Sequence, residues 1–192
     1  MESLKYDLAK IPLREVNQFL HSDASLLNGK HIEINNPNGA HNIAVGLRSE
    51  ATVTIHGHAG YYAAGMNQIA DVTIEGSVGS GVAENMMSGR VHVKGFASNA
   101  AGATANGGLL VIDGDAGEGL GDSIYEARLF VRGKVKSLGA DCEVKTMSLE
   151  DRKILVDLLE RSGHGDVSPE SFTLYGSART LYHFNVAKSG AY

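Results

Sequence analysis

Five segments repeat along the chain without gaps: Val53-Thr54-Ile55-His56-Gly57, Val72-Thr73-Ile74-Glu75-Gly76, Val91-His92-Val93-Lys94-Gly95, Leu110-Val111-Ile112-Asp113-Gly114 and Leu129-Phe130-Val131-Arg132-Gly133. Their closing glycines, at 57, 76, 95, 114 and 133, are each 19 residues apart. The first and third residues of every segment are Val, Ile or Leu, and this period of two is typical of a strand with one buried face. The repeat therefore predicts one short strand per 19-residue coil, with successive coils stacked directly on each other.

The register continues beyond each glycine. Two residues later stands a column of small apolar residues, Ala59, Val78, Ala97, Ala116 and Val135, which predicts a second and thinner buried wall. The fourth strand position carries Glu75, Lys94, Asp113 and Arg132, whose charges alternate as they should if these residues are neighbours on adjacent coils. The predicted fold is all-β: a single-stranded parallel β-helix of 19-residue coils, right-handed by analogy with known β-helices, with short helical caps at both ends.

The chain divides into three regions. Residues 1–30 are expected to form an N-terminal helical cap, because Pro12 precedes apolar residues at helical spacing. Residues 31–147 are the β-helix, whose degenerate first unit places Ala44-Val45-Gly46-Leu47 19 residues before Ala63-Ala64-Gly65-Met66. Residues 148–192 are a helix from Ser148 to about Arg161, followed by an extended tail rich in aromatic residues.

Composition and charge limit the cellular compartment and the partners that we expect for this protein. The single cysteine, Cys142, and the absence of a signal peptide at the start of the given sequence indicate a cytoplasmic protein. No apolar run is long enough to cross a membrane. The net charge is −5 and Lys and Arg do not cluster, so neither nucleic acid nor membrane is expected as a partner.

No catalytic, cofactor-binding or metal-binding residues are predicted. His56 and His58 have no acid or cysteine at metal-ligand spacing, and Cys142 has no evident activating base. The run Gly117-Glu118-Gly119-Leu120-Gly121 is better explained by turns of the coil than by a phosphate-binding loop. The acidic residues Asp113, Asp115, Glu118, Asp122 and Glu126 leave open a carbohydrate-active enzyme, although a solvated face is the commoner outcome.

Tyrosine and methionine gather at equivalent parts of adjacent coils, which suits an adaptable partner surface. An alternative, of equal weight, is that the methionines fill the third wall of the coil. The candidate interface residues are Tyr61, Tyr62, Met66, Asn67, Glu84, Asn85, Met86, Met87, Asp122, Tyr125, Arg179 and Tyr182.

Several blocks carry a family resemblance: Gly60-Tyr61-Tyr62-Ala63-Ala64-Gly65-Met66-Asn67, Gly81-Val82-Ala83-Glu84-Asn85-Met86-Met87-Ser88-Gly89, Gly121-Asp122-Ser123-Ile124-Tyr125-Glu126-Ala127, Ser137-Leu138-Gly139-Ala140-Asp141-Cys142 and Tyr175-Gly176-Ser177-Ala178-Arg179. The Gly-x-Gly-x-Gly type repeat is similar to the C-terminal β-helix domain of the glutamate synthase large subunit. Over nearly the whole chain, the blocks more closely resemble a stand-alone version, a subunit of N-methylglutamate synthase and related complexes. Those relatives carry more coils between the third and fourth units, so this chain departs from them by whole coils.

The resemblance implies a non-catalytic scaffold subunit in a hetero-oligomer. It implies that the chain bridges a class II glutamine amidotransferase-like subunit and an FMN-dependent glutamate-synthase-like subunit. FMN and an iron–sulfur cluster are then expected in that partner, and no cofactor in this chain. An alternative is the β-helix subunit of a formylmethanofuran dehydrogenase-like complex, which shares the glycine repeat.

Overall fold

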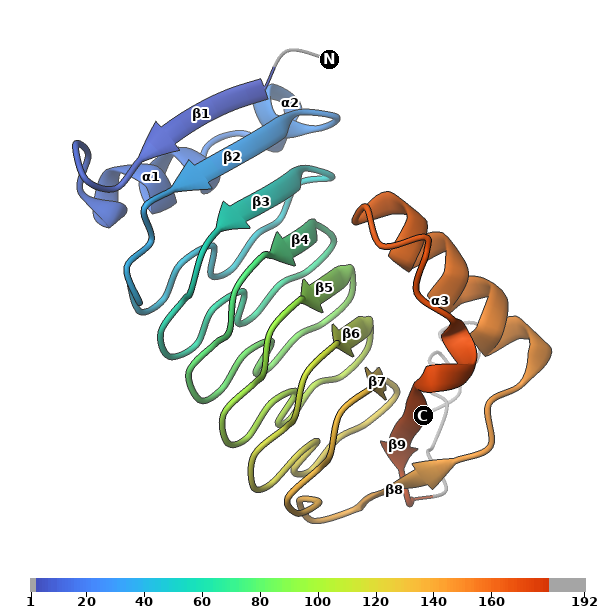
Figure 1. The fold of residues 1–192 in the computed structure, drawn as a ribbon. Coiled ribbons are helices and arrows are strands. Elements are labelled where there is room, and N and C mark those ends of the chain that lie inside the picture. Colours follow the sequence, from blue (N-terminus) through green and yellow to red (C-terminus); the bar gives the residue numbers. More distant parts are fainter. Residues whose placement is uncertain (1–2, 180–192) are drawn as a thin grey trace, which may run out of the picture.

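The computed structural model describes residues 3–179, and within them the strands form one continuous sheet (Figure 1). The strands β1 to β7 pair in parallel and in chain order. Strand β9 then pairs antiparallel with β7, and β8 pairs antiparallel with β9. In spatial order they are β1 (Ser3–Asp7), β2 (His31–Asn35), β3 (Thr52–His56), β4 (Asp71–Ile74), β5 (Arg90–Val93), β6 (Leu109–Ile112), β7 (Arg128–Val131), β9 (Thr173–Ser177) and β8 (Cys142–Lys145). The chain is therefore a parallel β-helix, as the repeat predicted.

Equal sequence offsets do share one environment. From β3 to β7, each strand residue pairs with the residue 19 positions later in the next strand, for example Ile55 with Ile74. The inward row Ile55, Ile74, Val93, Ile112 and Val131 is at most 1% exposed. The small column from Ala59 to Val135 also forms parallel bridges from coil to coil. Both predicted walls are confirmed.

The first coil is longer than predicted. Ile34 of β2 pairs with Ile55 of β3, a step of 21 residues. The N–H of Ala64 donates to the carbonyl of Ile43, and the equivalent N–H of Ala83 donates to the carbonyl of Ala63. Ile43 and Ala63 therefore occupy equivalent positions, 20 residues apart. The predicted 19-residue alignment of Ala44 with Ala63 is therefore wrong. One extra residue lies around the turn 36–39, where Asn36, Asn38 and Gly39 have left-handed backbone angles. The other lies between Leu47 and Ala51, because Leu47 matches Asn67 at a step of 20 and Ala51 matches Ala70 at a step of 19.

The N-terminal end is covered by helices and by an additional strand. Helix α1 (Leu13–Leu20) begins after Pro12 and buries Val16 and Leu20 in the same core as the first coil. A short helix α2 (Ala24–Leu27) follows, with Leu27 buried. Strand β1 pairs with β2, so the sheet extends into the region that the sequence assigned to the helical cap.

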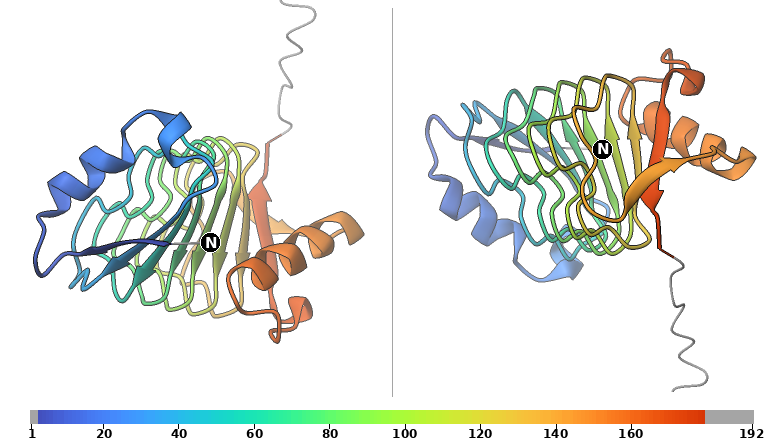
Figure 2. Two further views of the ribbon diagram at one scale, coloured as in Figure 1. Left: turned by 90° about the horizontal axis from the view of Figure 1, so that it is seen from above. Right: turned by 90° about the horizontal axis from the view of Figure 1, so that it is seen from below.

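The C-terminal region lies partly beside the solenoid rather than beneath it. Helix α3 (Leu149–Arg161) begins at Ser148 with a capping box to Asp151, as its sequence predicted. It packs against the outer face of the strands (Figures 1 and 2), where Val111 and Phe130 are buried against Leu155, Leu158 and Leu159. The open end itself is covered by β9 and β8. Strand β8 leads directly into α3, and a 3-10 turn at Pro169–Ser171 connects α3 to β9. None of the helices within residues 3–179 is long and apolar enough to cross a membrane.

The wall opposite the sheet uses an unusual backbone. Left-handed φ angles recur at every second residue and stack from coil to coil: Tyr62, Ala64 and Met66; Gly81, Ala83 and Asn85; Ala100, Gly102 and Thr104; Gly119, Gly121 and Ser123. Glycine suits such angles best, yet most of these positions hold other residues. The alternation turns the backbone sharply, so neither strand nor helix periodicity predicts which side chains in this wall face inward.

Candidate functional site

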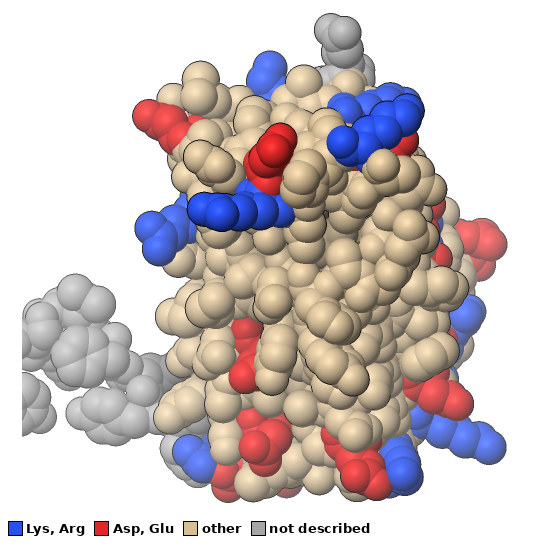
Figure 3. Space-filling view, turned by 90° about the vertical axis from the view of Figure 1, so that its left-hand side faces the viewer, with Lys and Arg blue, Asp and Glu red and all other residues tan. Residues whose placement is uncertain are grey.

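The non-strand parts of three consecutive coils form a surface almost without charge. Residues 57–70, 76–89 and 95–108 contain one Asp, Glu, Lys or Arg, which is Glu84, and we call them the uncharged face. The equivalent segment of the next coil, 114–127, holds four acids before Arg128. Figure 3, which looks at the side where strands β3–β7 end, shows a broad area without charged side chains across the middle of the solenoid. Protein interfaces are depleted of charge at their centres in the same way.

Large apolar side chains project from this surface. Tyr61, Tyr62, Met66 and Met87 are each about half exposed, and Phe96 is 56% exposed. Phe96 was missed by the sequence analysis, although a signal was present. It occupies the position after the closing glycine, where the other coils carry the polar residues His58, Ser77, Asp115 and Lys134. Aromatic and methionine side chains at this density are characteristic of binding surfaces.

Two of the predicted interface residues are not on the surface. Asn67 is fully buried, and its side-chain amide bonds to both the N–H and the carbonyl of Ala70, at 3.1 and 2.8 Å. Met86 is also fully buried and fills the third wall of its coil. Their assignment to the interface was wrong because the left-handed residues of this wall reverse the expected inward and outward positions. The alternative prediction, that the methionines fill the third wall of the coil, is therefore correct for Met86 and wrong for Met66 and Met87.

The remaining predicted residues fall into separate places. Glu84 is half-buried, and Asn85 is exposed and accepts a hydrogen bond from the Thr104 hydroxyl of the next coil, at 2.8 Å. Asp122 accepts from the backbone N–H of Ala140, at 2.7 Å, so it has a structural role in the last coil.

Tyr125 and Arg179 lie together at the C-terminal end. The guanidinium carbon of Arg179 is 5.9 Å from the centre of the Tyr125 ring, and Arg179 also pairs with Asp141. Both residues line a cavity of about 550 Å³. Tyr182 lies outside the residues that the structure describes. The predicted set is thus brought together as two surfaces, one on the uncharged face and one around Arg179.

The groups considered for catalysis are engaged in structural contacts. Burial, reinforced by the neighbouring Glu143, raises the pKa of the Cys142 thiol to about 11, which leaves it protonated and unreactive. Glu118 pairs with Lys136, at 2.8 Å, and Asp115 accepts from the backbone N–H of Lys134, at 2.7 Å. These acidic residues are spread over different walls of one coil and each has its own partner.

The two histidines of the His56-Gly57-His58 motif have different partners. The His56 ring lies between Glu75 and Glu33, with N–O distances of 2.8 and 3.2 Å. His58 accepts the backbone N–H of Ser77 instead, at 2.9 Å. The two rings therefore do not form a common site.

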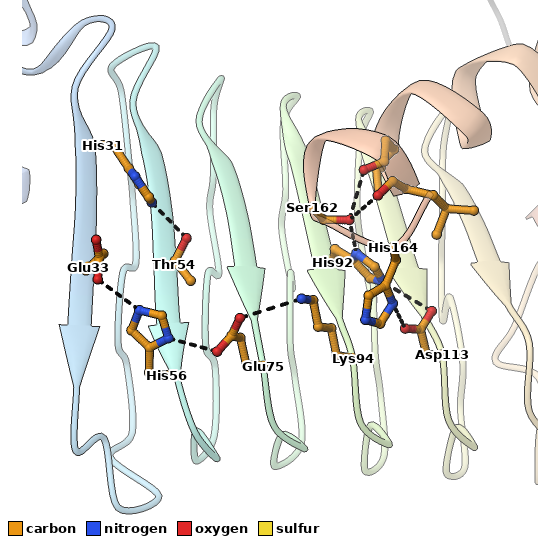
Figure 4. Close-up of polar contacts among 12 residues, drawn as sticks. His31, Glu33, Thr54, His56, Glu75, His92, Lys94, Asp113, Ser162 and His164 are labelled. Carbon is orange, nitrogen blue, oxygen red and sulfur yellow. Dashed lines mark hydrogen bonds and ion pairs between the residues drawn. The ribbon is translucent and has the colours of Figure 1, made fainter. Parts of the chain in front are cut away.

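The predicted row of alternating charges is confirmed only in part. Glu75 pairs with Lys94 at 3.5 Å, and the row extends towards the N-terminus through His56, Glu33 and Lys5. Asp113 leaves the row. Its carboxylate turns beneath the end of α3, towards His92 and His164 (Figure 4).

Asp113 is ionised despite its burial. Burial alone raises the pKa of this carboxyl, but the hydrogen bond and charge of His92, with the charges of His164 and Arg132, outweigh burial and bring the pKa below its usual value. His92 also bonds through Nδ1 to the Ser162 hydroxyl, at 2.6 Å. The resulting Ser–His–Asp chain is not a hydrolytic triad. Ser162 is the C-terminal cap of α3, where carbonyl groups gather rather than the N–H donors that an oxyanion requires.

Comparison with known proteins gives one close relative. The chain is 46% identical to Protein GlxC of Rhizobium meliloti (strain 1021), over 97% of this chain and 98% of that protein. No protein-family model and no solved structure matches the chain.

The alignment also shows a difference in length. It spans 224 positions, whereas 97% of 192 residues is about 186, so about 38 positions of GlxC have no counterpart here. That difference is close to the length of two 19-residue coils. At this identity and coverage, the chain belongs to the GlxC family.

Proposed function

We propose that this chain is a non-catalytic scaffold subunit of a glutamate-synthase-like complex of the N-methylglutamate synthase type. In this role it bridges a class II amidotransferase-like subunit and a subunit that carries FMN and an iron–sulfur cluster. The chain itself binds neither of these cofactors. The complex acts in nitrogen metabolism in the cytoplasm.

The uncharged face is the observation that carries the proposal. Three adjacent coils there expose Tyr61, Tyr62, Met66, Met87 and Phe96, while Glu84 is the one charged residue of their segments. A rigid stack of coils holds these side chains at fixed spacing, which favours a large and preorganised contact with a protein partner. The group around Tyr125 and Arg179, near the other end of the stack, gives a second surface, as a bridging subunit requires.

The family supports a stand-alone subunit. The match to GlxC covers 98% of that protein, so the similarity extends over the whole relative and not over one domain of a much larger chain. The blocks that resemble the N-methylglutamate synthase subunit include Tyr61, Tyr62 and Met87, which are exposed. These are the side chains that a partner would contact.

A carbohydrate-active enzyme is less well supported. Glycoside hydrolysis needs two carboxyl groups that face the same bond. Asp113 is buried beneath α3, and Asp122 is bonded to the backbone of the last coil. Nothing in the described residues favours the formylmethanofuran dehydrogenase-like alternative over the proposed one.

The proposal is tested by affinity purification of the tagged chain from its native organism at low salt. We expect two larger proteins to copurify, together with absorbance of a flavin near 450 nm and of an iron–sulfur cluster. The tag belongs at the N-terminus, because Arg179 and the candidate surface around it lie near the C-terminal end. Purification of the chain alone, or with a molybdenum or tungsten enzyme, would contradict the proposal.

A further inference from the structure

A buried cluster of metal-binding side chains lies where α3 meets the sheet. His92 comes from β5, Asp113 follows β6, and His164 lies in the loop after α3 (Figure 4). The side chains of His92 and Asp113 are 2% and 1% exposed, and that of His164 is 27% exposed. One ligand atom from each residue lies within 4.8 Å of the others. Two imidazoles and one carboxylate thus converge at a site that solvent reaches only from the His164 side.

The distances fit a shared ion. His92 Nε2 is 3.1 Å from Asp113 Oδ1, and His164 Nδ1 is 2.7 Å from Asp113 Oδ2. Ligands at about 2.1 Å from a tetrahedral ion lie about 3.4 Å from one another. Small rotations of the side chains therefore suffice to place all three ligand atoms around one centre.

Direct hydrogen bonds account for only part of the cluster, the contact between His92 and Asp113. Although His164 Nδ1 and Asp113 Oδ2 are close, they are not aligned for a hydrogen bond, and both are buried without such a partner among residues 3–179. Burial of two polar atoms without hydrogen bonds destabilises the folded state. An ion between them would satisfy both.

Ser162 orients His92 for coordination. The hydroxyl of Ser162 has one proton, and the carbonyl of Leu158 lies 2.9 Å from its oxygen. When that proton goes to the carbonyl, the Ser162 oxygen accepts a proton from His92 Nδ1, at 2.6 Å. An ion that displaces the proton between His92 Nε2 and Asp113 then meets the Nε2 lone pair directed into the site. Metal-binding histidines are typically held in this way, by a hydrogen bond from the second ring nitrogen.

We propose that His92, Asp113 and His164 bind a divalent transition metal ion, with Zn²⁺ as the best fit. Imidazole nitrogen and carboxylate oxygen suit Zn²⁺, whereas Ca²⁺ and Mg²⁺ prefer sites made only of oxygen. Three protein ligands leave a fourth position for water from the exposed side of His164. The ion would fasten the end of α3 to the sheet, because His164 is the ligand that comes from outside the coils. This inference does not depend on the proposed scaffold role.

The sequence did not point to this site. His92, Asp113 and His164 are 21 and 51 residues apart, and His92 and Asp113 occupy strand positions that face outward in the other coils. The histidines that stand out in the sequence are His56 and His58, and no metal site was predicted. The packing of α3 is what brings the third ligand to the first two.

Isothermal titration with Zn²⁺, after removal of metal by a chelator, tests the proposal on the full chain. We expect one Zn²⁺ per chain and a melting temperature that rises with Zn²⁺. The variant His164→Ala should lose that binding event and the rise in melting temperature, while His56→Gln should retain both. Co²⁺ added to the unmodified chain should give the visible absorption bands of an ion in a site of low coordination number. Absence of saturable binding by the parent chain, or equal binding by folded His164→Ala, would overturn the proposal. The titration and the Co²⁺ spectrum of the parent chain decide the matter even if a variant fails to fold.

Discussion

A Cβ atom on Gly76 would lie 2.5 Å from the carbonyl carbon of Gly57, in the preceding coil. The backbone of Gly76 is not left-handed, so close approach of the two coils is the reason for glycine at this position. We expect Gly76→Ala to lower the free energy of unfolding by about 1–3 kcal/mol, because the coils must separate to admit the methyl group. Urea unfolding followed by circular dichroism measures the change.

The matched control for that change is Gly165→Ala. A Cβ there would first meet Cγ of the Glu160 side chain, at 3.3 Å, and that flexible side chain can move aside. We expect a change within about 0.5 kcal/mol for this variant. Equal stability of the two variants would show that the coils are less tightly stacked than the structure indicates.

Asn17 replaces a missing coil at the N-terminal end. Its amide donates to the carbonyl of Asn42, at 2.8 Å, and accepts the N–H of Ala44, at 3.1 Å. In the next coils, the N–H equivalent to that of Ala44 bonds to a carbonyl of the preceding coil, as Ala64 does to the carbonyl of Ile43. Asn17→Ala should cost about 1–3 kcal/mol, because it leaves both groups of the first coil unpaired. Hydrogen exchange at the Ala44 amide should speed up, while the exposed neighbour substitution Gln18→Ala should leave it unchanged.

Phe130 fastens α3 to the sheet from the outside. Its side chain is fully buried beside Leu158 and Leu174, although it stands at an outward strand position. Phe130→Ala should destabilise the protein by about 3–5 kcal/mol, through lost burial and a cavity. Hydrogen exchange should increase mainly in α3. Thr54→Ala, at the same position of a different coil, should leave exchange in α3 unchanged.

Acid should weaken the N-terminal coils through Glu33. A hydrogen bond from the Ser3 side chain, together with Lys5 and His56, lowers the pKa of Glu33 from 4.5 to about 2. Because the folded state holds the proton less tightly, the stability that Glu33 contributes is present above pH 4.5 and is lost as the pH falls towards 2. Glu33→Gln should therefore show a smaller loss of stability between pH 5 and pH 2 than the parent chain. Identical pH profiles in urea unfolding would contradict this.

A charge placed on the uncharged face should block assembly without harming the fold. Phe96 is 56% exposed, so Phe96→Asp should leave the free energy of unfolding within about 0.5 kcal/mol of the parent value. The variant should copurify at least tenfold less of the proposed partner subunits, because a buried and unpaired carboxylate is costly in an interface.

Leu149→Asp is the control for that experiment. Leu149 is an equally apolar side chain, 78% exposed, at the start of α3 and away from the uncharged face. We expect it to copurify partners as the parent chain does. If both variants retained the partners, the uncharged face would not be the interface; if both lost them, the effect would not be specific to that face.

Much of the solenoid follows from the sequence alone. In a stack of equal coils, residues at one offset repeat one environment, so a 19-residue period determines strand pairing, the inward row through Ile55 and the column through Ala59. The helix from Ser148 to Arg161 was equally evident, because its capping residues act locally. The length of the first coil was not predicted, since the turn at 36–39 breaks the period on which the argument relied.

Contacts between distant parts of the chain were decided only by the tertiary structure. Left-handed angles at alternate residues turn Met86 inward and leave Met87 outside, and no periodic pattern of side chains encodes that choice. The docking of α3 buries His92 and Phe130 at a strand position that is partly exposed in β3 and β4, and it carries His164 to Asp113. Local repetition fixed the stack because each coil contacts its neighbours in sequence, whereas the site beneath α3 depends on a contact across 51 residues that no repeat specifies.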